Sequence, residues 1–244
     1  TLERQFTFPL LAAAAGAAGA VLGGLTGVAP ALTWALGAFV SATVLQEFAR
    51  GVRARRALHG EPIPAALASL LRRNGRRYGG YVVHLGIVII ALGVATSQAG
   101  TRETERTLAP GQHLSVGGHD IELVALRDVV EAQRRSVVAD LRVSENGGTP
   151  ADAHPALVTY PNAQQPIGSP GILARPGEDV YTILAAYDQR GKAWATIRVR
   201  VIPLVSWLWL GGLVVGLGAL VAALPPPRPR RPALPAAVGA GAVR

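Results

Sequence analysis

The chain contains no cysteine and no methionine among its 244 residues. Without a thiol it cannot form a disulfide, use a thiolate nucleophile, hold a cysteine-based metal or iron–sulfur site, or be attached covalently to anything through its own sulfur. Any chemistry must therefore use other side chains. Because Met is absent even at position 1, we expect the sequence to be the internal or C-terminal portion of a longer polypeptide.

Charged residues are also scarce, at 16% of the chain against 50% hydrophobic residues. The apolar residues are gathered into long runs, which favours a membrane protein over a soluble enzyme. No charge stands between Arg4 and Glu47, and one helix of that length would measure roughly 60 Å, about twice a hydrocarbon core. We predict two transmembrane helices within residues 1–49, at about 8–27 and 31–49, separated by a turn at the GVAP segment. A secretory signal is the alternative for the first run, but no cleavage-like site ends it.

Two more spans are predicted further along, so that the fold class is an α-helical membrane protein with four transmembrane helices. The third lies at about 79–98 and the fourth at 203–224, where two tryptophans near the entry are typical of a membrane interface. A short interfacial helix is predicted at 64–71. The segments between and after the spans are a basic loop at 50–78, an extramembrane domain at 99–202 and a disordered basic tail at 225–244.

The distribution of charge predicts the orientation of these spans. The 50–77 segment carries eight Arg and one acid, and the tail from 226 carries four Arg and no acid, whereas residues 98–200 hold eleven basic and twelve acidic residues. By the positive-inside rule, we expect both ends of the chain and the basic loop to be cytoplasmic, in a multi-pass membrane protein. A nucleic-acid partner is not needed to explain the net charge of +9, and membrane lipid is the expected surrounding.

The domain at 99–202 is predicted to be extracytoplasmic and rich in β-strands. A Gly117-Gly118 turn separates two short β-type stretches, and two further strands are predicted to be joined at 188–191. Another alternating stretch ends in Asn-Gly-Gly. The pattern fits a small sandwich or a barrel-like fold inserted between helices three and four, and it does not decide between them.

Within the four predicted spans His84 is the only histidine, an ionisable residue inside an otherwise apolar run. Such a residue is costly in a membrane, and it normally faces a bundle interior, a partner or a ligand. Three interpretations remain open from the spacing alone: a neutral histidine bonded to a neighbouring helix, a proton relay, or an axial ligand of a metal or haem iron. Neutral imidazole suits an iron in a dry site, provided that its other nitrogen finds an acceptor.

The other histidines carry weaker signals. His59 lies in the basic loop, His113 and His119 flank a predicted β-turn, and His154 precedes a proline, so we expect ordinary structural or surface roles for them. No HExxH pair, Cys/His metal pattern or phosphate-binding glycine loop occurs. The adjacent Glu178 and Asp179 would point to opposite faces of a strand and therefore form a poor catalytic pair.

Four stretches, taken in order, resemble the C-terminal part of one family. They are "ATVLQEFARGVRARR", "NGRRYGGYVVHLGIVIIALGVATS", "GEDVYTIL" and "RVIPLVSWLWLGGLVVGLGALV", and they are similar to the cytochrome c maturation protein F (CcmF) haem lyase family. "TYPNAQQPIGSP" adds a weaker match. The third-span motif, which contains His84, is the most specific of them.

This resemblance implies a bacterial inner-membrane subunit of cytochrome c-type biogenesis, which helps reduce haem and attach it covalently to apocytochrome c in the periplasm. It implies that His84 is one axial ligand of a transmembrane b-type haem, with the second ligand outside this chain and a further haem as substrate. It also implies partners: a haem chaperone, thiol-handling maturation subunits, apocytochrome c and the N-terminal part of the same protein.

The family's tryptophan-rich haem-handling motif, its flanking periplasmic histidines and its second b-haem ligand have no counterpart here. His113, His119 and His154 stand in no matching motif. We therefore assign no catalytic residue and expect this fragment alone to be inactive. The alternative function is a non-enzymatic membrane scaffold or transporter permease that carries a periplasmic β domain.

Overall fold

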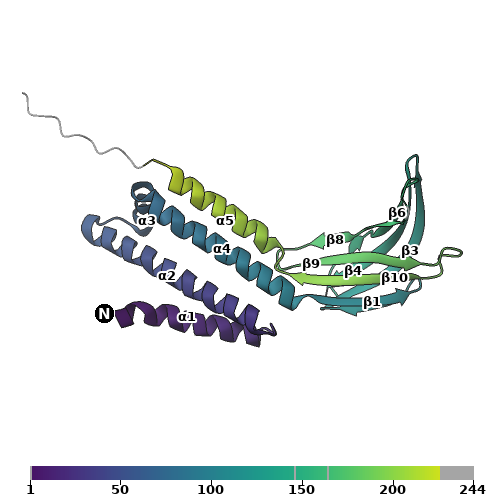
Figure 1. Ribbon diagram of the computed structural model, residues 1–244, viewed down its shortest axis with the longest axis horizontal. Helices are drawn as coiled ribbons and strands as arrows, with labels where there is room; N and C mark the ends of the chain where they lie inside the picture. Colours follow the sequence, from purple (N-terminus) through teal and green to yellow (C-terminus); the bar gives the residue numbers. More distant parts are fainter. Residues whose placement is uncertain (1, 146, 164, 226–244) are drawn as a thin grey trace, which may run out of the picture.

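The computed structural model describes residues 2–145, 147–163 and 165–225, and it divides into a helical half and a β-stranded half (Figure 1). Within these residues the chain forms five helices. They are α1 (Leu2–Leu22), α2 (Val28–His59), α3 (Ile63–Arg73), α4 (Gly75–Gly100) and α5 (Ser206–Ala223). Four of them, all except α3, are long and apolar enough to cross a membrane, which confirms the predicted set of four apolar helices.

The helix boundaries differ from the predicted spans. α1 begins at Leu2 and ends at Leu22 rather than covering 8–27, and α2 continues to His59 rather than ending at 49. Residues 50–78 are therefore mostly helix, and only short turns separate α2, α3 and α4. The length of an apolar run indicates how much of a helix can lie in lipid, but it does not indicate where the helix ends. α2 continues beyond the apolar run because arginine and alanine are good helix formers.

The remaining boundaries are closer to the prediction. α3 covers and slightly extends the predicted 64–71 piece, α4 is longer than 79–98 at both ends, and α5 lies inside 203–224. Glycines end the first two helices: Gly24 and Gly27 adopt positive φ in the turn after α1, and Gly60 does so after α2. The predicted disordered tail lies, from residue 226 onward, outside the described residues.

Ten strands follow α4 in the chain and precede α5. They are β1 (Arg102–Leu108), β2 (His113–Val116), β3 (His119–Glu131), β4 (Arg134–Glu145), β5 (Ala151–Ala153), β6 (Ala156–Thr159), β7 (Ile167–Ser169), β8 (Gly171–Ala174), β9 (Glu178–Tyr187) and β10 (Ala195–Pro203). One sheet has the order β1-β10-β9-β8, and the other has the order β2-β3-β4-β6-β7 with β5 paired to β4. The two sheets pack face to face, so the predicted choice between sandwich and barrel resolves as a sandwich.

The predicted hairpins are confirmed. Gly117 and Gly118, both at positive φ, join β2 to β3, and the turn after Tyr187 joins β9 to β10. Two glycines at positive φ suit the tight hairpin connections whose twist matches that of the strands. Alternate residues of each long strand point inward, which gives one aliphatic core. Its most buried members are Leu108, Ile121, Leu123, Leu141, Val143, Val180, Leu184, Ile197 and Val199.

The helices and the sandwich are joined through two adjacent strands. α4 passes into β1 through Thr101 alone, and β10 leads into α5 through Leu204 and Val205. β1 and β10 are hydrogen-bonded neighbours, with Arg102 opposite Val201. Leu204 takes a positive φ of 57°, and its N–H donates to the Gly177 carbonyl at 2.9 Å. Both connections are therefore short, and backbone hydrogen bonds hold the residues at or beside them in place.

Candidate functional site

Glycines allow α4 to approach α5 until their backbones touch. A Cβ atom built on Gly79 would lie 2.6 Å from the backbone nitrogen of Ala222, and one on Gly86 would lie 2.7 Å from that of Val215. Real Cβ atoms do not come so close to backbone atoms, so larger residues would force the helices apart. One face of α4 is thus closed by α5.

A second face of α4 packs against α2. The indole N–H of Trp34 donates to the Thr96 hydroxyl at 3.1 Å, and the ring centroids of Phe48 and Tyr78 lie 5.0 Å apart. A Cβ atom on Gly37 would lie 3.2 Å from Val88. Two sides of α4 are consequently covered by its own chain.

His84 lies on neither of these faces. It precedes Gly86 by two residues, which turns its side chain about 160° away from α5. The residue is exposed, and a Cβ atom added at Gly80, one turn earlier, would meet nothing within 4 Å. The surface around the histidine is therefore open to whatever surrounds this chain.

A single hydrogen bond sets the tautomer that a neutral His84 ring adopts. Its Nδ1 lies 2.8 Å from the Gly80 carbonyl oxygen, and because a carbonyl oxygen only accepts, Nδ1 carries the hydrogen. Nε2 then holds the lone pair, and it has no hydrogen-bond partner in the part of the chain that the structure describes. This bond is within α4, so the structure does not show the interhelical bond that was one interpretation of His84. An imidazole that donates through one nitrogen and offers a lone pair on the other, beside a residue without a side chain, fits the ligation of haem iron.

A cluster of charged and aromatic side chains precedes His84 along α4, and sequence reasoning did not predict it. Arg77 pairs with Glu47 of α2 at 2.5 Å and donates to the Tyr81 hydroxyl at 3.0 Å. Its guanidinium also lies 5.7 Å from the Tyr81 ring centroid, within the range of a cation–π contact. Glu47 is the only acid near the end of the second apolar run, and this isolated acid is the sequence feature that could have predicted an ion pair there.

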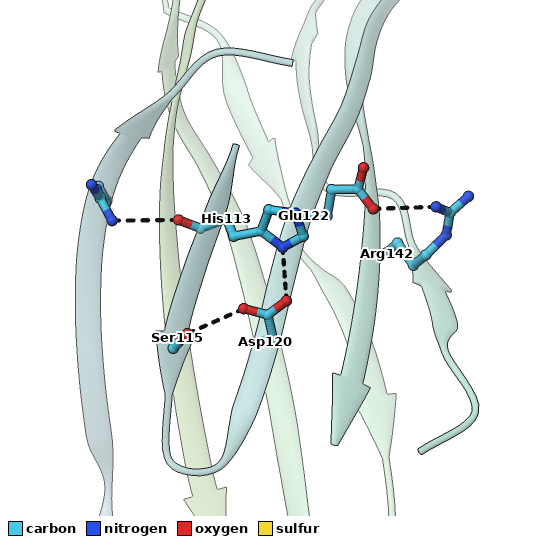
Figure 2. Close-up of polar contacts among 6 residues, drawn as sticks. His113, Ser115, Asp120, Glu122 and Arg142 are labelled. Atoms are coloured by element: carbon cyan, nitrogen blue, oxygen red, sulfur yellow. Dashed lines mark hydrogen bonds and ion pairs between the residues drawn. The ribbon is translucent and has the colours of Figure 1, made fainter. Parts of the chain in front are cut away.

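Two of the β-domain histidines are exposed and paired with aspartate. His113 Nδ1 lies 2.7 Å from Asp120, which also accepts from the Ser115 hydroxyl at 3.1 Å (Figure 2). Because the serine bonds the aspartate and not the histidine, the three residues lack the nucleophile–base contact of a catalytic triad. His154 pairs in the same way with Asp140 at 2.8 Å.

The third β-domain histidine, His119, is buried and bonds Glu178 at 2.7 Å. The neighbouring acid, Asp179, instead accepts from the backbone N–H of Arg175. The two adjacent carboxylates therefore have separate partners. None of these contacts brings a β-domain side chain to His84.

The sandwich is the part of the chain that matches a known family model. Residues 99–203 match the model described as the CcmF C-terminal beta-sandwich. The resemblance of the chain to CcmF is thereby confirmed for the C-terminal part.

Known CcmF proteins are similar beyond this domain. The chain is 34% identical over 147 residues to the cytochrome c-type biogenesis protein CcmF of Pseudomonas fluorescens, a match that covers 60% of this chain and 22% of that protein. It is 26% identical over 149 residues to CcmF of Escherichia coli, covering 61% of this chain and 23% of that protein. The chain thus matches less than a quarter of the length of either relative.

A solved structure of the cytochrome c haem lyase CcmF superposes on most of the molecule. The TM-score is 0.68 at 26% sequence identity, over 89% of this chain and 34% of the solved one. Because the match covers helices as well as strands, the helical half also has the CcmF arrangement.

Proposed function

We propose that the chain is the C-terminal part of a cytochrome c haem lyase, which helps reduce haem and attach it to apocytochrome c. The support is the similarity to proteins named for cytochrome c-type biogenesis and to a solved haem lyase. Haem is the substrate in this proposal, and a haem chaperone, thiol-handling maturation subunits and apocytochrome c are the partners. The N-terminal part of the same protein would complete the enzyme, and this chain alone would be inactive.

His84 is proposed as one axial ligand of a b-type haem, and one observation carries that proposal: its Nδ1 is bonded to the Gly80 carbonyl, which leaves Nε2 of this exposed side chain without a partner among the described residues. A haem bound there would supply one-electron redox chemistry. Gly80 fixes the tautomer through its carbonyl and leaves room for a flat group through its missing side chain. The second ligand would come from outside this chain and would also cover the exposed face against water.

The first test of this site compares two histidines in the full-length protein. His84→Gly should abolish the b-type Soret band of the purified protein, because the iron loses its nitrogen ligand. His113→Gly is the matched control, since it removes an exposed histidine of the β domain. An unchanged Soret band and bis-histidine signature in His84→Gly would contradict the assignment.

A second test keeps the ligand and fills the space beside it. Gly80→Leu should lower haem occupancy at least about tenfold, whereas the fold should persist because a Cβ atom at Gly80 meets nothing within 4 Å among the described residues. Gly216→Leu on α5, where the surroundings are equally open, should leave the Soret band unchanged. Equal haem content in both variants would mean that the face beside Gly80 is not the haem face.

The proposed location is the bacterial inner membrane, with the β domain in the periplasm and the basic segments 50–78 and 225–244 in the cytoplasm. The uneven distribution of arginine supports this orientation. The lack of cysteine makes a direct test possible, because single cysteines can be introduced into a silent background. Gln133→Cys should react with an impermeant maleimide added outside spheroplasts, and Gly60→Cys should react only after lysis. The reverse pattern would invert the topology.

A further inference from the structure

Three ionisable residues stand in register with inward-facing positions of the sandwich; His119 is buried there, whereas Glu145 and Glu178, at strand ends, are partly exposed. In β3 the alternation His119, Ile121, Leu123 faces the core, and in β4 Glu145 continues the inward series of Leu141 and Val143. In β9, Glu178 precedes the inward-facing Val180. Such positions normally hold aliphatic residues, as they do in the rest of this domain, and placing charge there costs free energy unless it has a partner.

These three residues come together at one end of the sandwich. His119 and Glu145 are directly opposite each other in the β3–β4 ladder, and Glu178 reaches His119 from the other sheet. One ring nitrogen of His119 and one carboxylate oxygen from each glutamate lie within 4.8 Å of one another. Ligands of a tetrahedral Zn²⁺ ion are about 3.4 Å apart, so modest side-chain movements would bring all three to one ion.

The His119 ring gives an independent sign that a partner is missing. Its side chain is completely buried, Nε2 is bonded to Glu178, and Nδ1 has no hydrogen-bond partner. Buried polar atoms in native proteins are nearly always satisfied, and an exception points to a water or an ion. Among the described residues, only one of the two ring nitrogens of His119 therefore has a hydrogen-bond partner.

We propose that His119, Glu145 and Glu178 bind a divalent transition-metal ion, with Zn²⁺ as the best match. One imidazole and two carboxylates from three strands suit Zn²⁺, whereas Ca²⁺ and Mg²⁺ prefer oxygen ligands throughout. The ion would neutralise the two carboxylates and join the two sheets, because Glu178 belongs to one sheet and the other two ligands belong to the opposite sheet.

The surroundings allow an ion to enter and give a role to one arginine. Glu178 lines a cavity of about 300 Å³ between the sandwich and the turn after α1, which opens a route to the site. Glu145 is 45% exposed in its side chain and pairs with Arg175. Arg175 therefore holds one ligand in the metal-free protein and must release it when the ion binds.

The test is calorimetric titration of Zn²⁺ into the full chain, purified in detergent and freed of metal by chelation. One ion per chain is expected, and Glu145→Gln and Glu178→Gln should each weaken binding at least about tenfold. Arg175→Ala should strengthen binding, because it frees Glu145. His119 is left unchanged, since replacing a fully buried ring could prevent folding and obscure the result.

The matched control removes the exposed imidazoles that could bind the same ion weakly. His113→Gln/His154→Gln should bind Zn²⁺ as the unmodified chain does. Zn²⁺ should also raise the melting temperature of the unmodified chain and of this control but not that of Glu145→Gln. Absence of saturable binding, or affinity lost in the control and retained in both glutamate variants, would overturn the proposal. Neither readout depends on haem.

Discussion

The helical half and the β-stranded half are packed in different ways. Helices α4 and α5 meet through backbone at glycines, and leave large apolar side chains such as Leu213 and Trp209 exposed. The sandwich instead encloses an aliphatic core and carries most of its charged residues outside, where Arg198 pairs with Glu103 and Glu105 of the neighbouring strand.

This difference shows where each half obtains its stability. Burying aliphatic side chains away from water stabilises the sandwich from within. Helices in lipid gain little from burying one more leucine, and depend instead on close packing and a few hydrogen bonds between them. The open apolar faces of the helices therefore require lipid or another polypeptide, whereas the sandwich supplies its own interior.

The largest effect is expected from a cavity in the sandwich core. Ile197→Ala removes a completely buried side chain and should lower the free energy of unfolding of the domain by about 2–5 kcal/mol. Ile172→Ala, at a half-exposed edge position, is the control and should change it little. Thermal unfolding followed by the β-sheet circular dichroism signal measures both, and similar losses would mean that the core does not dominate stability.

The next largest effect tests the glycine contact between helices. Gly86→Leu should force α4 and α5 apart at a cost of about 1–3 kcal/mol, while the sandwich stays folded. Gly216→Leu, where nothing lies close, should be neutral. Loss of helical signal on heating in detergent reports the difference. If both variants melt alike, close backbone packing is not what holds this pair.

A smaller effect is expected from the hydrogen bond between α2 and α4. Trp34→Phe keeps the ring contact but removes the donor to Thr96, and should cost about 1 kcal/mol. Trp209→Phe on exposed α5 surface provides the comparison. A melting temperature equal in the two variants would show that this bond contributes nothing measurable.

The smallest effect concerns the β9–β10 turn and depends on pH. Backbone N–H groups of Arg190, Ala193 and Gly191 donate to the Asp188 carboxylate and hold its pKa below the usual value. A depressed carboxyl pKa stabilises the fold above the ordinary value of about 4 and loses that contribution as pH falls through the folded value. Asp188→Ala should therefore lower the melting temperature slightly at pH 7, and the gap should narrow below about pH 4. A gap independent of pH would contradict this role.

Periodicity and turn chemistry predicted most of the fold, and each difference from the structure has a physical reason. Glycine pairs and alternating residues marked the hairpins correctly because both depend on neighbours in sequence. Helix ends were misplaced because hydropathy does not indicate where a helix that leaves the lipid stops. The choice of a sandwich needed strand pairing over long sequence separations, which no local pattern specifies.

The candidate site was predictable in part. His84 stood out because it is an ionisable residue in an apolar run, and the need for an acceptor on its second nitrogen was foreseen, but its partner on the same helix was not identified. Arg77 with Glu47, and His119 with Glu145 and Glu178, join residues on separate elements. His119, Glu145 and Glu178 can be recognised as neighbours only when the pairing of their strands is known, because only then is it clear which side chains meet.

No long linker separates the sandwich from the helices. It leaves the helices through β1 and β10, two hydrogen-bonded strands that continue into α4 and α5 after one and two residues. A force applied to the far end of the sandwich, such as the hairpin between β3 and β4 (Figure 1), would therefore be passed on to α4 and α5, and α4 is the helix that carries His84.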